Sequence, residues 1–288
     1  MLRLAVATNA ETSERMQSPL ADRGIEVGRI DVSERSLPIT GPAAFDSSAF
    51  DVGFVFPPRL AEGGVADALL DVAWINDRES VLRSRNKAET LARLSEAGLP
   101  VPDTVAVSNP VGEETLRGTF EAFDPPVVVK PNSTTRGTGV ALARDLDSFL
   151  GICDYLDLVH DYRATGDRSF LVQEFLPDAR DYRVMVVDGR VVGAVERRLP
   201  GDALAAGQWK HNVHRGATAT GVELDGEARE VAEAASEALA IPWLGVDLLV
   251  SDDRLIVNET NARPTIDAAT KYEDGFWDDV AALIRRTE

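Results

Sequence analysis

The chain has 288 residues, of which 44% are hydrophobic and 27% are charged, a composition typical of a soluble globular protein with about two domains. Acidic residues outnumber basic ones by 48 to 30, and a net charge of −18 argues against nucleic acid or an anionic membrane as a partner. The single cysteine, Cys153, excludes an intrachain disulfide framework, a thiolate zinc cluster and a Cys-x-x-Cys redox pair.

Lysine is rare: it occurs only at Lys87, Lys130, Lys210 and Lys271, and the other 26 basic residues are arginines. An acidic, lysine-poor surface is expected of a halophilic protein from a salt-loaded cytoplasm. No apolar run approaches the roughly 20 residues of a membrane-spanning helix, and the first residues lack the features of a signal peptide, so we expect a cytoplasmic protein. Where lysine is avoided, the few that remain are expected to have roles that arginine does not fill.

Residues 1–100 alternate between strand and helix patterns. Apolar runs at 2–7 and 51–56 predict strands, and 11–23 and 59–70 predict helices, which together indicate a small α/β domain with a largely parallel sheet. Ligands of such sheets bind beyond the carboxyl ends of strands, here Thr8-Asn9 and Pro57 to Arg59, although tight turns occupy the same positions.

A further helix is predicted over about 84–97, with Lys87 in its first turn. Gly98 and Pro100 end it, and a new domain is expected to begin at residue 101.

The buried strand 127–131 carries Lys130 near its end and leads into the loop 132–139, which contains Gly137 and Gly139. Backbone N–H groups of such a loop approach phosphate closely, and the lysine adds a point charge. A glycine-containing hairpin turn is the simpler interpretation, and the loop is not a Walker loop because no Gly-Lys-Ser/Thr follows. Another strand is predicted over 170–177.

Asp188-Gly189 between apolar runs predicts a hairpin with a two-residue turn. In the register that this turn sets, one face carries Asp181, Arg183, Glu196 and Arg198. These charges are either solvated or form a paired-arginine site for phosphate or carboxylate.

The polar stretch 208–216 contains His211 and His214, which without nearby carboxylates or thiols favour hydrogen bonding over metal binding. Apolar residues at helical spacing predict core helices over 225–240 and from Phe276 to Ile284.

A second hairpin is predicted between apolar runs at 244–250 and 255–264. If its loop is Asp252 to Arg254, Asp247 lies opposite Glu259, and Asn261 shares the face of Glu259. Two buried carboxylates repel unless a cation lies between them, and an oxygen-only cluster suits Mg²⁺ or Mn²⁺. A solvated edge hairpin is the alternative.

Several of these motifs follow one another in a recognisable order: Asp-Tyr-Arg at 181–183, Glu-Arg-Arg at 196–198, Asn-x-His-Arg-Gly at 212–216, Gly-Val-Asp at 245–247 and Asn-Glu-Thr-Asn-Ala at 258–262. From about residue 76 to the C-terminus the chain resembles the ATP-grasp superfamily, and within it the RimK-like glutamate ligases and their glutathione synthetase relatives. The resemblance implies an α/β (α+β) ATP-grasp fold. A pre-grasp domain would span 1–100 and an ATP-grasp domain 101–288, with the nucleotide held between subdomains 101–176 and 177–288.

The resemblance also implies the roles of individual residues. ATP would be bound by the lysines, the glycine loop, the strand end and the polar stretch: Lys87, Lys130, Gly137, Gly139, Gln173, Glu174, Phe175, Leu176, Asp181, Lys210 and Asn212. Asp247, Glu259 and Asn261 would hold two Mg²⁺ (or Mn²⁺) ions. A substrate carboxylate would attack the γ-phosphate, and Arg183 and Arg198 would stabilise the acyl-phosphate until an amine displaces phosphate.

Two departures from the family pattern bear on the substrate. The glutamate ligases usually continue Asn-Ala-Ser-Pro-Gly, whereas residues 261–265 read Asn-Ala-Arg-Pro-Thr. Arg263 therefore either binds a substrate carboxylate or forms a structural ion pair. The loop 132–139 is also less acidic and less rich in glycine than in the family.

The expected function is ATP-dependent ligation of an amino acid, glutamate by resemblance, to an amine acceptor that is a small molecule, a cofactor, a peptide or a protein tail. A glutathione-synthetase-like or amino-group-carrier ligase with another substrate pair is the nearest alternative, and a nucleotide-binding regulator without turnover is the alternative outside enzymes. Homo-oligomerisation is compatible with the sequence.

The halophilic surface yields a direct test. Because hydrated carboxylates repel one another at low ionic strength, we expect the thermal unfolding midpoint to rise between low and molar KCl. A midpoint that stays constant or falls over that range would contradict the interpretation.

Overall fold

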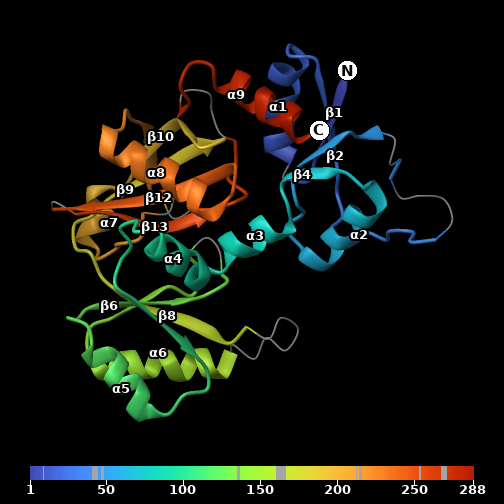
Figure 1. Ribbon diagram of the computed structural model, residues 1–288. Coiled ribbons are helices and arrows are strands. Elements are labelled where there is room, and N and C mark those ends of the chain that lie inside the picture. Colours follow the sequence, from blue (N-terminus) through green and yellow to red (C-terminus); the bar gives the residue numbers. More distant parts are fainter. Residues whose placement is uncertain are drawn as a thin grey trace.

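The computed structural model describes residues 1–8, 10–40, 45–46, 49–134, 137–159, 167–211, 213, 216–252, 254–266 and 271–288. Its strands form three separate sheets, and each sheet is the centre of one body of the molecule (Figure 1). Helices pack on all three sheets, so the predicted mixed α/β class is confirmed. Asn9 and Asn212, which were expected near ligands, and His214, which was expected to form hydrogen bonds, lie outside the described residues.

The N-terminal sheet is parallel throughout and has the strand order β2-β1-β3-β4. Its strands are β1 (Leu2–Val6), β2 (Ile25–Arg29), β3 (Val52–Val55) and β4 (Ala73–Asn76). Helices α1 (Ala10–Ala21) and α2 (Leu60–Leu70) form the crossovers. The predicted parallel sheet is confirmed, although β2 and β4 were not among the predicted strands.

The helix predicted over 84–97 is two helices, α3 (Arg78–Arg85) and α4 (Lys87–Glu96). Asn86 between them has an extended backbone, and its side chain accepts a hydrogen bond from the Glu89 N–H at 3.2 Å. This N-cap starts a new helix at Lys87, so the predicted helix start was wrong while Lys87 does occupy a first turn. Both helices pack against the C-terminal sheet.

The middle sheet is antiparallel, with the strand order β5-β8-β6-β7. Its elements are β5 (Thr104–Ser108), α5 (Glu113–Glu121), β6 (Val127–Pro131), β7 (Ala141–Ala143), α6 (Leu146–Val159) and β8 (Ser169–Glu174). These elements surround a hydrophobic core of their own, built only from residues between 107 and 172. The middle body is therefore packed independently of the other two.

The C-terminal sheet is also antiparallel and has the strand order β11-β10-β9-β12-β13. Its elements are β9 (Arg180–Val187), β10 (Arg190–Arg198), α7 (Gly201–Ala205), β11 (Thr218–Gly221), α8 (Gly226–Leu239), β12 (Trp243–Ser251) and β13 (Arg254–Asn261). Helix α8 packs on β9, β10, β12 and β13, which leaves the other face for the site.

The hairpin of β12 and β13 places Asp247 opposite Glu259, as predicted, but by a different route. Ser251 pairs with Arg254, so the turn is one residue shorter than expected. A bulge at Asn258 restores the pairing, because Leu248 pairs with Val257 and the register then shifts by one residue.

The hairpin of β9 and β10 has the predicted two-residue turn, but a bulge at Val192 shifts the register beyond it. Asp181 therefore lies opposite Arg197 rather than Glu196. A shift of one residue moves the following side chains to the opposite face of a strand, so the predicted face shared by Asp181, Arg183, Glu196 and Arg198 was wrong.

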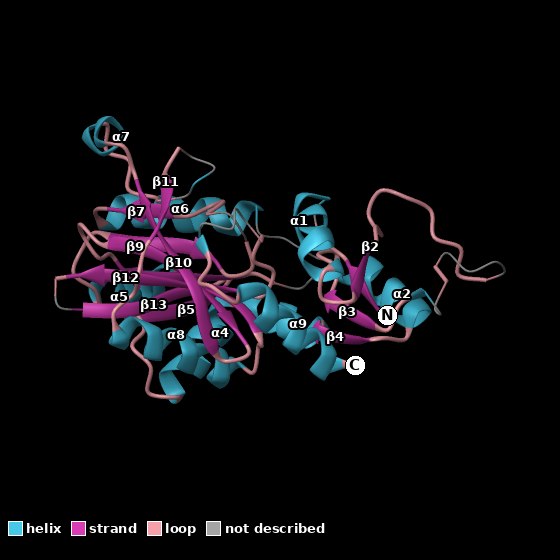
Figure 2. Ribbon diagram, turned by 90° about the horizontal axis from the view of Figure 1, so that it is seen from above, coloured by secondary structure: helices cyan, strands magenta, loops and turns pink. Residues whose placement is uncertain are grey.

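The last helix, α9 (Phe276–Thr287), returns to the N-terminal sheet and packs on α1, β3 and β4. Figures 1 and 2 accordingly show both chain termini on the same body. One hydrophobic core runs from β1 through the C-terminal sheet to α9. The buried side chain of Asn76, at the end of β4, links the N-terminal sheet to the C-terminal sheet, because it donates to the carbonyls of Trp243 and Ala262 at 2.6 Å each. The division into domains at residue 100 stays a prediction, and no described helix is long and apolar enough to cross a membrane.

Candidate functional site

Two cavities meet at the open face of the C-terminal sheet. The inter-sheet cavity, of about 560 Å³, lies between the middle and C-terminal sheets. The junction cavity, of about 740 Å³, lies between the C-terminal sheet and the N-terminal body. Both are lined by the same five residues, which form a shared wall: Lys87, Gly137, Arg197, Asp247 and Glu259.

Three of the four lysines line the inter-sheet cavity. Lys130, at 4% exposure, donates from Nζ to Gln173 Oε1 at 2.8 Å, and burial lowers its pKa to about 8. Lys87 donates to the Thr134 carbonyl and lies 3.3 Å from Glu259 Oε1, while Lys210 donates to the Val140 carbonyl. Positive charge thus converges on one region from α4, β6 and the segment after α7.

Apolar side chains line another part of the inter-sheet cavity. Phe175 and Trp209 meet edge to face with ring centroids 5.7 Å apart, and Leu176 and Leu249 also line the cavity. Lys210 Nζ lies 5.4 Å from the centre of the Trp209 ring, so apolar and cationic groups are neighbours here. Glu174 accepts two hydrogen bonds from Arg254, at 2.7 and 2.8 Å, which lower the pKa of its carboxyl group. The cavity therefore combines an apolar slot with cationic side chains, a suitable environment for a base and its phosphates.

The glycines of the loop after β6 have left-handed backbones, with φ of 64° at Gly137 and 75° at Gly139. Gly137 lies on the shared wall. A Cβ at Gly139 would lie 2.8 Å from Pro131 Cγ, so this position requires glycine for space as well as for backbone conformation.

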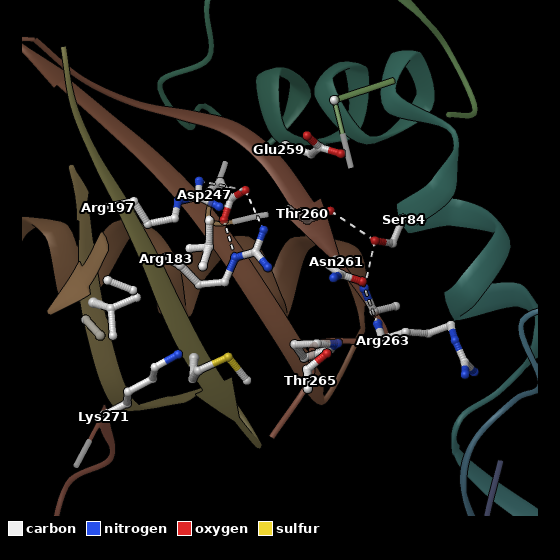
Figure 3. A pocket seen from close by; sticks show the side chains of 18 of the residues that line it. Ser84, Arg183, Arg197, Asp247, Glu259, Thr260, Asn261, Arg263, Thr265 and Lys271 are labelled. Atoms are coloured by element: carbon white, nitrogen blue, oxygen red, sulfur yellow. Dashed lines mark hydrogen bonds and ion pairs between the residues drawn. The ribbon is translucent and has the colours of Figure 1, made fainter. Parts of the chain in front are cut away.

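A buried ionic network crosses the face of the C-terminal sheet, as Figure 3 shows. Arg183 lies directly opposite Asp247 on the neighbouring strand and donates to both of its carboxylate oxygens, at 2.5 and 2.7 Å. Arg197 lies 3.1 Å from Asp247 Oδ2 and donates from Nε to Asp181 Oδ1 at 2.8 Å. Burial alone would raise the pKa of Asp247, but the two guanidinium groups lower it to about 2, whereas burial raises the pKa of Asp181 to about 6.

Oxygen donors gather next to this network. Glu259 lies directly opposite Asp247, and both line the junction cavity with Asn261. Asn261 Oδ1 accepts a hydrogen bond from the Arg263 N–H at 2.9 Å. Within the described ranges, no three histidine, cysteine, aspartate or glutamate side chains form a metal-binding group. The amide oxygen of Asn261 is an additional oxygen donor beside the two carboxylates.

The profile of the RimK-like ATP-grasp domain matches residues 84–281. The chain belongs to the RimK-like ATP-grasp family. A probable alpha-L-glutamate ligase of Aliivibrio salmonicida is 31% identical over 225 residues, which are 75% of this chain and 67% of that protein. Another from a Marinomonas species is 30% identical over 221 residues, 73% of this chain and 65% of that protein. The matched part thus spans about two thirds of these relatives.

Solved structures support the ATP-grasp fold over nearly the whole chain. A RimK domain ATP-grasp protein of Sphaerobacter thermophilus superposes with a TM-score of 0.67 at 23% identity, covering 99% of this chain and 98% of that one. A D-cycloserine synthetase gives a TM-score of 0.74 at 20% identity, covering 99% and 100%. A D-alanine–D-alanine ligase of Bacillus anthracis gives 0.68 at 16% identity, covering 100% and 97%. The predicted superfamily and fold are confirmed.

Arg197, and not Arg198, joins Arg183 in the buried ionic network, so the predicted placement of Arg198 beside Arg183 was wrong. The Arg198 side chain is 70% exposed, lies on the opposite face of β10 and pairs with Glu196 at 2.7 Å. The bulge at Val192 explains the difference, because without it Arg197 would face away from Asp181. An Arg-Arg pair read from sequence alone does not reveal which arginine faces the site.

Arg263 lies at the junction between the N-terminal body and the C-terminal sheet. It donates to the carbonyl of Phe56 and, at 2.8 Å, to that of Ala7, which directly follow β3 and β1. It thus binds backbone at the carboxyl ends of two parallel strands, where the sequence predicted ligands. The alternative of a structural ion pair was wrong within the described chain, and substrate binding stays a prediction.

Other residues of the cavities had no signal in the sequence. Trp209 and Arg85 line the inter-sheet and junction cavities, respectively, and neither belongs to a motif that we recognised. His211 lines the inter-sheet cavity with Nδ1 4.0 Å from Asp181, in keeping with a polar rather than a metal-binding role.

Burial of Lys130 has a measurable consequence for stability. Its pKa is about 8 in the folded protein and 10.5 in the reference state, so between these values the unfolded chain binds more protons and stability rises with pH. We expect the free energy of unfolding of the nucleotide-free protein to rise by up to about 3 kcal/mol over this interval. Urea unfolding at several pH values should show this increment in the parent protein but not in Lys130→Met.

All other titrating groups are common to the two proteins and cancel in the difference. Parallel profiles for the parent and Lys130→Met would mean that Lys130 is not desolvated as the structure indicates.

Proposed function

We propose that this chain is an ATP-dependent carboxylate–amine ligase that forms an amide through an acyl-phosphate. The observation that supports this best is the shared wall between the two cavities. A nucleotide in the inter-sheet cavity would place its terminal phosphate beside Lys87, Arg197 and Asp247, and a substrate in the junction cavity would reach the same residues from the other side. In-line transfer of a phosphoryl group needs this arrangement of donor and acceptor.

ATP binding is proposed for the residues expected from the sequence. The apolar slot of Phe175, Leu176 and Trp209 would hold adenine, with the backbone of Gln173 and Glu174 along its edge. Lys87, Lys130 and Lys210 would contact phosphates, covered by the loop with Gly137 and Gly139 and assisted by Asn212. Asp181 is assigned to the ribose side. Its ion pair with Arg197 would connect the nucleotide to the reacting end.

Asp247, Glu259 and Asn261 have suitable donors for a hard divalent cation, since all three offer oxygen and two are carboxylates that face each other across a hairpin. We assign two Mg²⁺ or Mn²⁺ ions to these residues. When bound, such ions neutralise the phosphate oxygens. In the structure, Lys87 and the two arginines pair with these carboxylates. If bound cations compensated the charge of the carboxylates, the three basic side chains would be able to turn towards the phosphates.

The reaction would need no nucleophilic side chain. A substrate carboxylate oxygen forms a bond to the γ-phosphorus and ADP leaves with the electrons of the broken P–O bond. The nitrogen of the amine then bonds to the acyl carbon, phosphate leaves, and the nitrogen loses its proton. Arg183 and Arg197 would stabilise the negative charge that develops on the acyl-phosphate and on the tetrahedral intermediate.

The names of the curated relatives make glutamate the first amino acid to test. We propose an amine acceptor that is a small molecule, a cofactor, a peptide or a protein tail, and a cytoplasmic setting of high salt. The chain belongs to a family of ligases, and it has the arginines and carboxylates that the proposed reaction needs. For both reasons we favour a ligase over a nucleotide-binding regulator without turnover.

The neighbouring arginines provide a matched pair of variants. With ATP, Mg²⁺, glutamate and pooled acceptors in high salt, we expect Arg197→Ala to lower kcat about 10²–10³-fold because it removes one donor to the developing charge. Arg198→Ala, which removes a neighbouring but outward-facing arginine, should change kcat by less than about threefold. Phosphate release and product mass would be measured, with circular dichroism to verify folding.

Equal loss in the two variants, or loss in Arg198→Ala alone, would contradict the assigned register. ATP binding without ADP release across a broad panel of amino acids and acceptors would contradict the ligase itself.

A further inference from the structure

The junction cavity is strongly cationic although the protein is strongly acidic. Among the described residues, six basic and three acidic side chains line it, in a chain whose net charge is −18. The basic side chains are Arg85, Lys87, Arg183, Arg197, Arg263 and Lys271, and the acidic ones are Glu11, Asp247 and Glu259. Such a cavity favours an anionic occupant.

The six cations fall into two groups. Lys87, Arg183 and Arg197 pair with Glu259 and Asp247 on the shared wall. Arg85 and Arg263 have different partners, since Arg85 donates to the Pro58 carbonyl at 2.9 Å and Arg263 to the two strand-end carbonyls. In Figure 3 the Arg263 guanidinium lies well away from the Asp247 network, so the cavity has two cationic ends.

The end formed by Arg85 and Arg263 lacks compensating charge. Neither guanidinium has a carboxylate within 4 Å in the part of the chain that the structure describes. Burial lowers the pKa of both, and that of Arg263, to about 10, is lowered further by Arg85 itself. Two half-buried cations that repel each other are unfavourable without an anion between them.

Hydrogen-bonding capacity leads to the same conclusion. A guanidinium has five N–H donors, and the described contacts use one nitrogen of Arg85 and two of Arg263. The remaining donors can bind a planar carboxylate with two parallel hydrogen bonds. Backbone carbonyls orient both guanidiniums but leave their charge uncompensated.

We propose that Arg85 and Arg263 form a second carboxylate-binding site, which selects a substrate whose second carboxylate is remote from the one that reacts. This proposal rests on the proposed function, since the reacting carboxylate would lie at the Arg183 and Arg197 end. The ligand is a dicarboxylate that supplies the reacting carboxylate, either a free amino acid or the acidic end of a peptide. Lys271, on another side of the cavity in Figure 3, adds to the cationic field around it.

Calorimetric titration tests the site without requiring turnover. The parent protein with ADP and Mg²⁺ would be titrated with L-glutamate, with its two monoamides, glutamine and isoglutamine, and with the dipeptide Glu-Glu. We expect at least one probe with two remote carboxylates to bind the parent protein. The Arg85→Gln substitution should weaken the affinity for that probe roughly 10- to 100-fold. Glutamine and isoglutamine distinguish which carboxylate of glutamate is bound, and Glu-Glu represents the acidic end of a peptide.

Arg78→Gln is the matched control, because Arg78 is exposed on the same helix and does not line the cavity. It should bind every probe as the parent does. ADP affinity should be equal in all three proteins, so loss of the nucleotide site is detected separately from loss of the carboxylate site.

Binding of the dicarboxylates within twofold of the parent in Arg85→Gln would overturn the proposal. So would monoamides that bind as tightly as glutamate, or no binding of any dicarboxylate by a parent protein that binds ADP.

Discussion

The site depends on the buried carboxylate of Asp247, which the order of strands places between cations and another acid. β12 lies between β9 and β13, so Asp247 has Arg183 directly opposite on one side and Glu259 on the other. Arg197 reaches the same carboxylate from β10. Charges at this depth are tolerated only as a group, because removal of one partner from a buried ion pair typically costs about 3–5 kcal/mol. The network therefore constrains both register and function.

The two cavities differ in how their walls are built. The inter-sheet cavity lies between bodies with separate hydrophobic cores, whereas the junction cavity lies inside a region where the N-terminal body and the C-terminal sheet share one core. Relative motion is the default expectation for separately packed bodies, and a continuous core resists it. The inter-sheet cavity is thus suited to opening and closing, and the junction cavity to a fixed shape.

Much of this arrangement could be predicted from local patterns. One Asp-Gly turn and several apolar runs correctly indicated the two hairpins, the strand of Lys130 and the parallel N-terminal sheet. The failures came from features without a local signature. A one-residue bulge at Val192 exchanged Arg198 for Arg197, and an N-cap at Asn86 divided one helix into two. Arg85 could not be assigned at all, since its position follows only from how the N-terminal body packs on the C-terminal sheet.

The central claim is that divalent cations bound to the hairpin acids connect the nucleotide to the reacting end. Anomalous diffraction at the manganese edge, from crystals grown with Mn²⁺ and a non-hydrolysable ATP analogue, tests it directly. We expect manganese peaks about 2.0–2.3 Å from carboxylate oxygens of Asp247 and Glu259 and next to the analogue's phosphates. Manganese bound only to phosphate, with Asp247 still held by Arg183 and Arg197, would contradict it.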